Sequence, residues 1–89
     1  MSDAQVQHTI AQLVPEGAHV LDLGCGDGAL LQHLITTRRC TGYGIEIDDD
    51  NVLACVRRGV NVLQLNLHAG PKALLDQSFD AVLQIDTRA

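Results

Sequence analysis

The sequence predicts an α/β fold in which helices cover both faces of a parallel β-sheet. The first observation is a short apolar run at residues 20–23 that leads directly into a glycine-rich turn, Gly24-x-Gly26-x-Gly28. The second is that apolar runs typical of buried strands alternate along the chain with segments of helical periodicity. Such alternation favours a doubly wound sheet, whose parallel strands are joined by right-handed crossovers.

Size and charge narrow the possible functions. The 89 residues are expected to form one small domain, and the net charge of −5 without a basic stripe argues against a nucleic-acid partner. The arginine pairs at residues 38–39 and 57–58 each lie near a predicted helix end, where a cation complements the helix dipole. No apolar run is long enough to span a bilayer, and the first residues do not resemble a signal peptide, so no membrane partner is expected.

The cysteines and histidines give no metal pattern. The three cysteines are widely spaced without a C-x-x-C pair, and the four histidines are scattered. Zinc sites need closely spaced ligands, so no metal is expected. Free cysteines in this pattern suit a reducing compartment, and we expect a cytoplasmic protein.

The first two elements are a helix and a strand. Residues 3–14 carry apolar side chains at helical spacing, and Ser2 or Asp3 can cap the start of this helix. The Pro-Glu-Gly sequence at residues 15–17 is expected to end it. A strand is predicted at residues 19–23, because mostly branched apolar residues are typical of a buried parallel strand.

After the glycine turn, the pattern predicts a helix, a strand and a second helix. The helix covers residues 29–37, and the strand lies in the centre of residues 42–48. Asp48, or one of the two acids after it, is expected to cap a helix that runs through residues 51–58. Gly59 suits the position just after the end of that helix.

The last three elements repeat the alternation. Residues 60–65 predict a third strand, and residues 79–85 predict a fourth. Between them, residues 69–75 predict a short helix with Pro71 near its first position.

The glycine turn and one acid form the candidate ligand site. In a doubly wound sheet, ligands bind beyond the carboxyl ends of the strands where the strand order reverses, and the turn lies there. Glycines at residues 24, 26 and 28 let the backbone adopt positive φ and let a ligand approach without meeting a Cβ. Glu46 lies near the end of the second predicted strand, at a distance along the chain where an acid can accept hydrogen bonds from both hydroxyls of a ribose.

These stretches resemble a known family. The sequence DLGCGDG at residues 22–28 resembles motif I of class I S-adenosylmethionine-dependent methyltransferases. Together with GYGIEID at residues 42–48 and RGVNV at residues 58–62, it is similar to the MetW family of bacterial methionine biosynthesis proteins. The resemblance covers about residues 16–83 and implies a Rossmann-like methyltransferase fold with the strand order 3-2-1-4.

The resemblance also implies a site for S-adenosyl-L-methionine. Glu46 would bind the ribose, and Asn66 stands where related proteins place an acid that accepts from the adenine amino group. Asp22 has two open roles: fixing the turn through backbone N–H groups, or contacting the amino group of the cofactor. The expected cofactor-binding residues are Asp22, Gly24, Cys25, Gly26, Asp27, Gly28, Glu46 and Asn66.

Three functions stay open. The resemblance implies a cytoplasmic protein of methionine biosynthesis that acts with homoserine O-acyltransferase. A methyltransferase of a small molecule is the second hypothesis, and a non-functional truncated fragment is the third. Methyltransferase domains are about twice this length, and the family pattern stops matching after Leu83. We therefore expect residues 1–89 to be the N-terminal half of such a domain, and to catalyse no methyl transfer alone.

Overall fold

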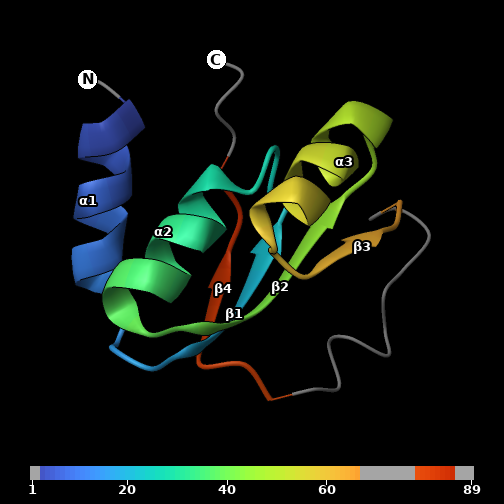
Figure 1. Ribbon diagram of the computed structural model, residues 1–89. Helices are drawn as coiled ribbons and strands as arrows, with labels where there is room; N and C mark the ends of the chain where they lie inside the picture. The colour runs from blue at the N-terminus through green and yellow to red at the C-terminus, as the bar shows by residue number, and fades with distance from the viewer. Residues whose placement is uncertain (1–2, 67–77, 86–89) are drawn as a thin grey trace.

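Four parallel strands form the sheet of the computed structural model, which describes residues 3–66 and 78–85 (Figure 1). The strands are β1 (His19–Leu23), β2 (Thr41–Glu46), β3 (Val62–Gln64) and β4 (Ala81–Leu83). Their order is β3-β2-β1-β4, as the sequence predicts, and all three pairings are parallel. The order reverses between β1 and β4, so ligands are expected beyond the carboxyl end of β1, where the glycine turn begins.

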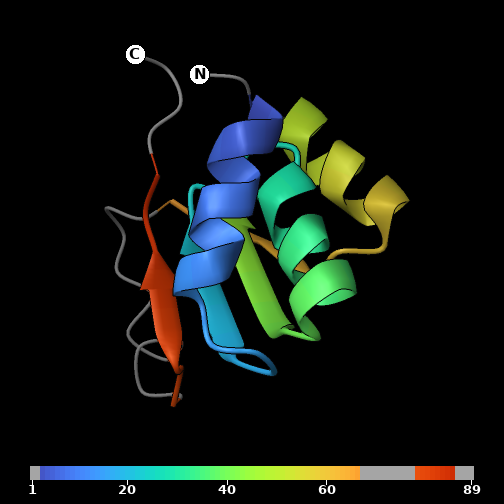
Figure 2. The same ribbon diagram turned by 90° about the vertical axis from the view of Figure 1, so that its left-hand side faces the viewer.

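The sequence predicts helices on both faces of the sheet, whereas the three helices of the described residues lie on one face (Figure 2). They are α1 (Asp3–Leu13), α2 (Ala29–Arg38) and α3 (Asp49–Arg58). Each lies within one or two residues of its predicted range. The predicted helix at residues 69–75 falls outside the described residues.

The α3 helix begins and ends as its sequence predicts. The Asp48 side chain accepts a hydrogen bond from the Asn51 backbone N–H at 3.0 Å, which confirms Asp48 as the capping residue. At the other end, Gly59 adopts a left-handed conformation with φ of 76°. Left-handed backbone favours glycine, and this turn directs the chain into β3.

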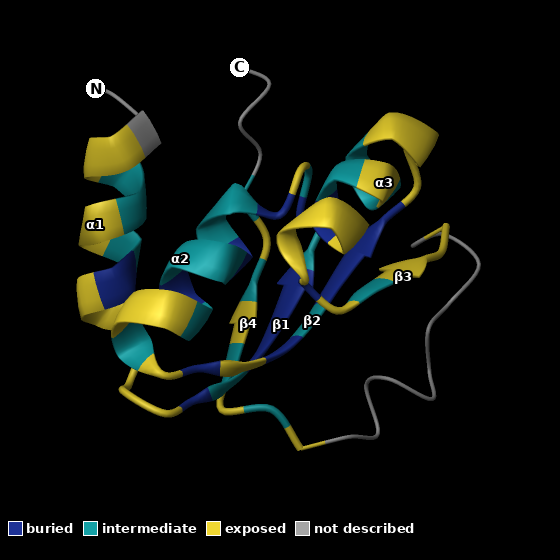
Figure 3. Ribbon diagram, viewed as in Figure 1, coloured by how far each residue is buried: buried dark blue, intermediate teal, exposed yellow. Residues whose placement is uncertain are grey.

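The two faces of the sheet have separate apolar clusters, and the central strands β1 and β2 are mostly buried (Figure 3). On the helix face, Val20 of β1 packs in one cluster with Leu31 and Leu34 of α2. On the opposite face, Leu21 and Ile45 are fully buried. Successive strand residues point to opposite faces, so neighbouring residues of β1 belong to different clusters.

The third and fourth strands are shorter than predicted. Val60 does not join β3, because its backbone N–H donates to the Cys55 carbonyl oxygen at 3.0 Å and so completes the end of α3. At the start of β4, the Phe79 ring stacks on His19 with 4.7 Å between ring centroids. Phe79 therefore adds to the apolar face opposite the helices, although it precedes the strand.

Candidate functional site

The glycine turn lies between β1 and α2, against the end of β2. The backbone N–H groups of Gly24 and Cys25 both donate to the Ile45 carbonyl oxygen, at 2.8 and 2.9 Å. Gly24 and Gly26 have φ of 73° and 59°. A Cβ added at either glycine would meet no heavy atom within 4 Å. The turn therefore presents bare backbone to open space, as a ligand-binding turn requires.

Glu46 connects the end of β2 to this turn. Its side chain is buried, with the residue 4% exposed. One carboxylate oxygen accepts from the Gly26 N–H at 2.9 Å, and the other accepts from the N–H groups of Ile47 and Asp48 at 3.1 and 3.0 Å. A carboxylate has about four acceptor positions, so these three bonds leave room for a hydroxyl donor. The structure thus brings together the turn and the acid that the sequence pairs.

Asp22 lies in β1 just before the turn and is 3% exposed. Burial, together with the nearby charge of Glu46, raises the pKa of the Asp22 carboxyl to about 7. No hydrogen bond joins this carboxyl to any part of the chain that the structure describes, and its oxygen atoms are not fully enclosed by those residues. Of the two roles left open by the sequence, the fixing of the turn is performed instead by Ile45 and Glu46.

Asp27 faces α2 and α3. One carboxylate oxygen accepts from the Ala29 N–H at 3.0 Å at the start of α2, and the other lies 3.4 Å from a guanidinium nitrogen of Arg58. Arg58 also donates to the Asp27 carbonyl oxygen at 3.0 Å and to the Gln32 side chain at 2.8 Å. Asp27 therefore anchors the turn to both helices through its side chain.

Arg58 was missed as a site residue by the sequence reasoning, which assigned it only to the dipole of its own helix. Thirty-one positions separate it from Asp27. Nothing in the local pattern pairs these two residues. The contact arises because the end of α3 and the start of α2 lie side by side on the helix face (Figure 1).

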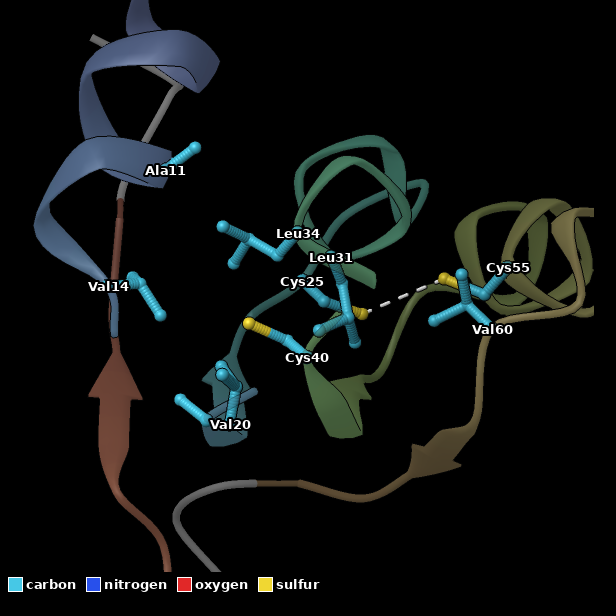
Figure 4. Close-up of a cluster of buried hydrophobic side chains, with 10 residues drawn as sticks. Ala11, Val14, Val20, Cys25, Leu31, Leu34, Cys40, Cys55 and Val60 are labelled. Carbon is cyan, nitrogen blue, oxygen red and sulfur yellow. Dashed lines mark hydrogen bonds between the residues drawn. The ribbon is translucent and has the colours of Figure 1, made fainter. Parts of the chain in front are cut away.

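Cys25 presents only its backbone to the turn, because its side chain points into the core (Figure 4). Its sulfur lies 3.7 Å from that of Cys55 in α3. Burial is the main cause that raises the pKa of both thiols, so both are held protonated. The sequence did not predict that Cys55 lies beside the turn, because this contact joins residues thirty positions apart.

Asn66 follows β3 at the same edge of the sheet as the turn. Glu46 pairs in register with Gln64 of β3, and Asn66 comes two residues later with its side chain exposed. This placement leaves the Asn66 side chain on the ligand-binding edge, and its contact with adenine stays a prediction.

Residues 3–66 and 78–85 contain no group of three or more potential metal-binding side chains. Within the same residues, no helix has the length and apolar character needed to cross a membrane.

Comparison with known families agrees with this geometry. The family model described as "Methionine biosynthesis protein MetW" matches residues 4–88. The chain belongs to the MetW family. The match includes the turn, Glu46 and Asn66, so the whole candidate site lies within the MetW region.

Two curated relatives are much longer than this MetW chain. The bifunctional methionine biosynthesis protein MetXA/MetW of Rhodopirellula baltica is 35% identical over 85 residues, covering 86% of this chain and 14% of the relative. The fatty-acid O-methyltransferase of Mycolicibacterium smegmatis is 36% identical over 88 residues, covering 93% of this chain and 32% of the relative.

Solved structures of methyltransferases share the fold of this MetW chain. An RNA methyltransferase from Salinibacter ruber, in complex with S-adenosyl-L-homocysteine, is 26% identical with a TM-score of 0.75. The match covers 94% of this chain and 59% of that one. A TehB-like SAM-dependent methyltransferase from Corynebacterium glutamicum is 20% identical with a TM-score of 0.76. The match covers 90% of this chain and 43% of that methyltransferase. The four-stranded sheet thus has the Rossmann-like methyltransferase architecture.

Proposed function

We propose that this MetW-family chain binds S-adenosyl-L-methionine, or its demethylated product, across the glycine turn. The observation that carries the proposal is the Asp22 carboxyl: the residue is only 3% exposed, no hydrogen bond joins the carboxyl to the described residues, and its oxygen atoms are not fully enclosed by them. Such a group costs free energy unless a ligand supplies a donor. The amino group of the cofactor is a cationic donor that suits it.

The other parts of the cofactor match the remaining residues. Its ribose hydroxyls are donors for the open acceptor positions of Glu46, and its adenine amino group is a donor for the Asn66 side chain. Gly24 and Gly26 leave open space in which the cofactor can lie against the backbone. These residues bind and orient the cofactor, whose sulfonium supplies the methyl group when it is bound.

Charge supports this choice of ligand over a dinucleotide. Asp22 and Glu46 make the site acidic, and the chain carries a net charge of −5. S-adenosylmethionine carries a sulfonium and an ammonium cation and no phosphate. A pyrophosphate would be repelled by the two acids, because like charges in a buried site raise the free energy of binding.

The proposed pathway role is in methionine biosynthesis, with homoserine O-acyltransferase as partner. The family resemblance implies this partner, and the Rhodopirellula relative joins a MetW part and a MetXA part in one protein. Co-purification of the chain with the acyltransferase from the same organism tests the partnership. Recovery of the acyltransferase at the level of a tag-only control would contradict it.

A second candidate function is methyl transfer to a small molecule. The identity to the Mycolicibacterium fatty-acid O-methyltransferase favours it. In that case the site aligns the methyl group with an acceptor, and proximity supplies much of the rate. Incubation with radiolabelled cofactor and candidate acids distinguishes the two functions, because only a methyltransferase produces labelled ester.

Calorimetric titration with S-adenosylhomocysteine tests the binding site. Replacing Glu46 with alanine should weaken binding by about 1–3 kcal/mol, the range for a lost charge-assisted hydrogen bond. Asp50→Asn, which removes an exposed acid of α3, is the matched control and should leave the affinity unchanged. Equal affinities for the wild type and Glu46→Ala would remove Glu46 from the site.

A further inference from the structure

Two cysteine side chains meet directly beneath the glycine turn. The sulfur atoms of Cys25 and Cys55 lie 3.7 Å apart, and the two residues come from the turn and from the middle of α3 (Figure 4). Both thiols also lie within hydrogen-bonding distance of the same acceptor, the Gly26 carbonyl oxygen, at 3.7 and 3.3 Å. The thiol pair and the turn therefore form one connected group.

The surrounding backbone makes room for both sulfur atoms. A Cβ at Gly44 of β2 would collide with the Cys25 sulfur, and a Cβ at Gly28 would lie 2.9 Å from the Cys55 sulfur. Gly44 needs no left-handed backbone, so its lack of a side chain is explained by the Cys25 side chain, whose sulfur and Cβ an added Cβ would both meet. Two close-packed thiols in glycine-lined space differ from Cys40, whose sulfur lies near the carbonyl oxygens of Pro15 and Arg38.

We propose that Cys25 and Cys55 form a reversible dithiol–disulfide site, oxidised by hydroperoxides, that controls the conformation of the glycine turn. A disulfide needs a sulfur–sulfur distance of about 2 Å, so the two atoms must approach by roughly 1.7 Å from their present 3.7 Å.

The reaction balances with one hydroperoxide for each disulfide. Cys25 belongs to the turn itself, whereas Cys55 lies in α3 and is 0% exposed, so an oxidant that enters at the turn meets Cys25 first. Because burial holds the Cys25 thiol protonated, its proton passes to the departing oxygen as the sulfur attacks the peroxide; the O–O bond breaks, and a sulfenic acid and one molecule of water or alcohol form. The Cys55 sulfur then attacks the sulfenic sulfur and the S–O bond breaks. The hydroxyl group leaves as water after it takes the proton of the Cys55 thiol.

Oxidation changes the turn because a disulfide has no S–H donor. The Gly26 carbonyl oxygen loses both of its thiol donors, and Cys25 is drawn toward α3. The Gly26 N–H is the group that binds Glu46. The oxidised turn should therefore hold Glu46 less firmly and bind the proposed ligand more weakly, and this second half of the inference rests on the proposed function.

Intact mass and peptide mapping of the folded chain test the disulfide. After treatment with hydrogen peroxide and removal of the oxidant, we expect the loss of two hydrogen masses, one cross-linked peptide joining Cys25 to Cys55, and full reversal by dithiothreitol. Cys40→Ser should behave as the wild type, whereas Cys25→Ser and Cys55→Ser should not lose the two hydrogens. Circular dichroism checks that each variant folds, and the mapping of the wild type does not depend on any variant.

Several results would overturn the disulfide. They are a cross-link through Cys40, oxidation of Cys25 to an acid without a cross-link, or no mass change in the native chain under conditions that oxidise the urea-unfolded chain. Each of them shows that the two sulfurs do not join in the folded state.

Affinity measurements test the control of the turn. The Kd for S-adenosylhomocysteine should rise roughly fivefold or more on oxidation, within the usual range of coupling between sites, and return to its first value on reduction. An unchanged Kd in a chain shown by mass to be oxidised overturns the control of the turn. If the reduced chain does not bind this ligand at all, the proposed function fails, and the mass measurement still decides the disulfide.

Discussion

Asp22 should make the folded chain less stable as the pH rises, and Asp22→Asn should remove that dependence. Its pKa is raised from 3.8 to about 7 in the folded state, mainly by burial. A raised pKa means that the folded state holds the proton more tightly than the unfolded state. The associated stability is fully present below pH 3.8 and is lost as the pH rises through about 7.

The size of the effect follows from the shift. One pKa unit is worth about 1.4 kcal/mol, so a shift of roughly three units corresponds to about 4 kcal/mol between the two limits. Between pH 4.5 and pH 8, which lie inside those limits, about 3 kcal/mol should be lost. A buried asparagine without a partner also costs about 1–3 kcal/mol, but this cost does not vary with pH.

Urea unfolding at pH 4.5 and pH 8, followed by circular dichroism, measures the effect. Relative to the wild type, Asp22→Asn should gain about 3 kcal/mol of stability on going from the lower to the higher pH. Asp50→Asn, an exposed acid in the first turn of α3, controls for the general change in charge. If the difference between the wild type and Asp22→Asn is the same at both pH values, the Asp22 carboxyl does not titrate with a raised pKa. The proposed binding of the cationic amino group at Asp22 then loses its main support.

Three further predictions concern the site and the sheet. Asn66→Asp should tighten binding of S-adenosylhomocysteine by about 1 kcal/mol in calorimetry, because a carboxylate accepts more strongly than an amide; unchanged or weaker binding would place Asn66 away from adenine. Arg58→Ala should lower the free energy of unfolding in urea by about 1 kcal/mol, since its contacts with the turn are partly exposed, whereas Arg57→Ala should not. Val82, which is 54% exposed on β4 at the edge of the described sheet, should promote self-association. Sedimentation velocity should then show less association for Val82→Lys, and a monomeric wild type would contradict the reasoning.

Local patterns predicted the elements that position the site. The strand at residues 19–23 has its predicted bounds because a branched apolar run between two glycine turns leaves little choice of register. The Asp48 cap is equally local, since side chain and N–H are three positions apart. The meeting of Glu46 with the turn follows from the topology, because parallel neighbours bring their carboxyl ends to one edge.

Contacts between distant residues could not be predicted in this way. The pairs Arg58–Asp27 and Cys25–Cys55 depend on how α2 and α3 pack together. Apolar periodicity indicates which face of a helix is buried, but not which residues of two helices meet. The shortening of β3 has a similar cause. The Val60 N–H can bond either to a strand or to the end of α3, and only the packed structure decides between them.

Glu46 accepts hydrogen bonds from the part of the chain that the structure describes and Asp22 does not, and this difference affects which ligands the site can distinguish. Glu46 already accepts hydrogen bonds from three backbone N–H groups. A 2′-deoxy analogue of the proposed ligand would leave these three hydrogen bonds in place. Asp22 has no such substitute within the described residues, so an analogue without the amino group would leave its carboxyl with only the small solvent contact that 3% exposure allows. Selectivity should therefore be steep at the amino-acid end of the ligand and shallow at its sugar.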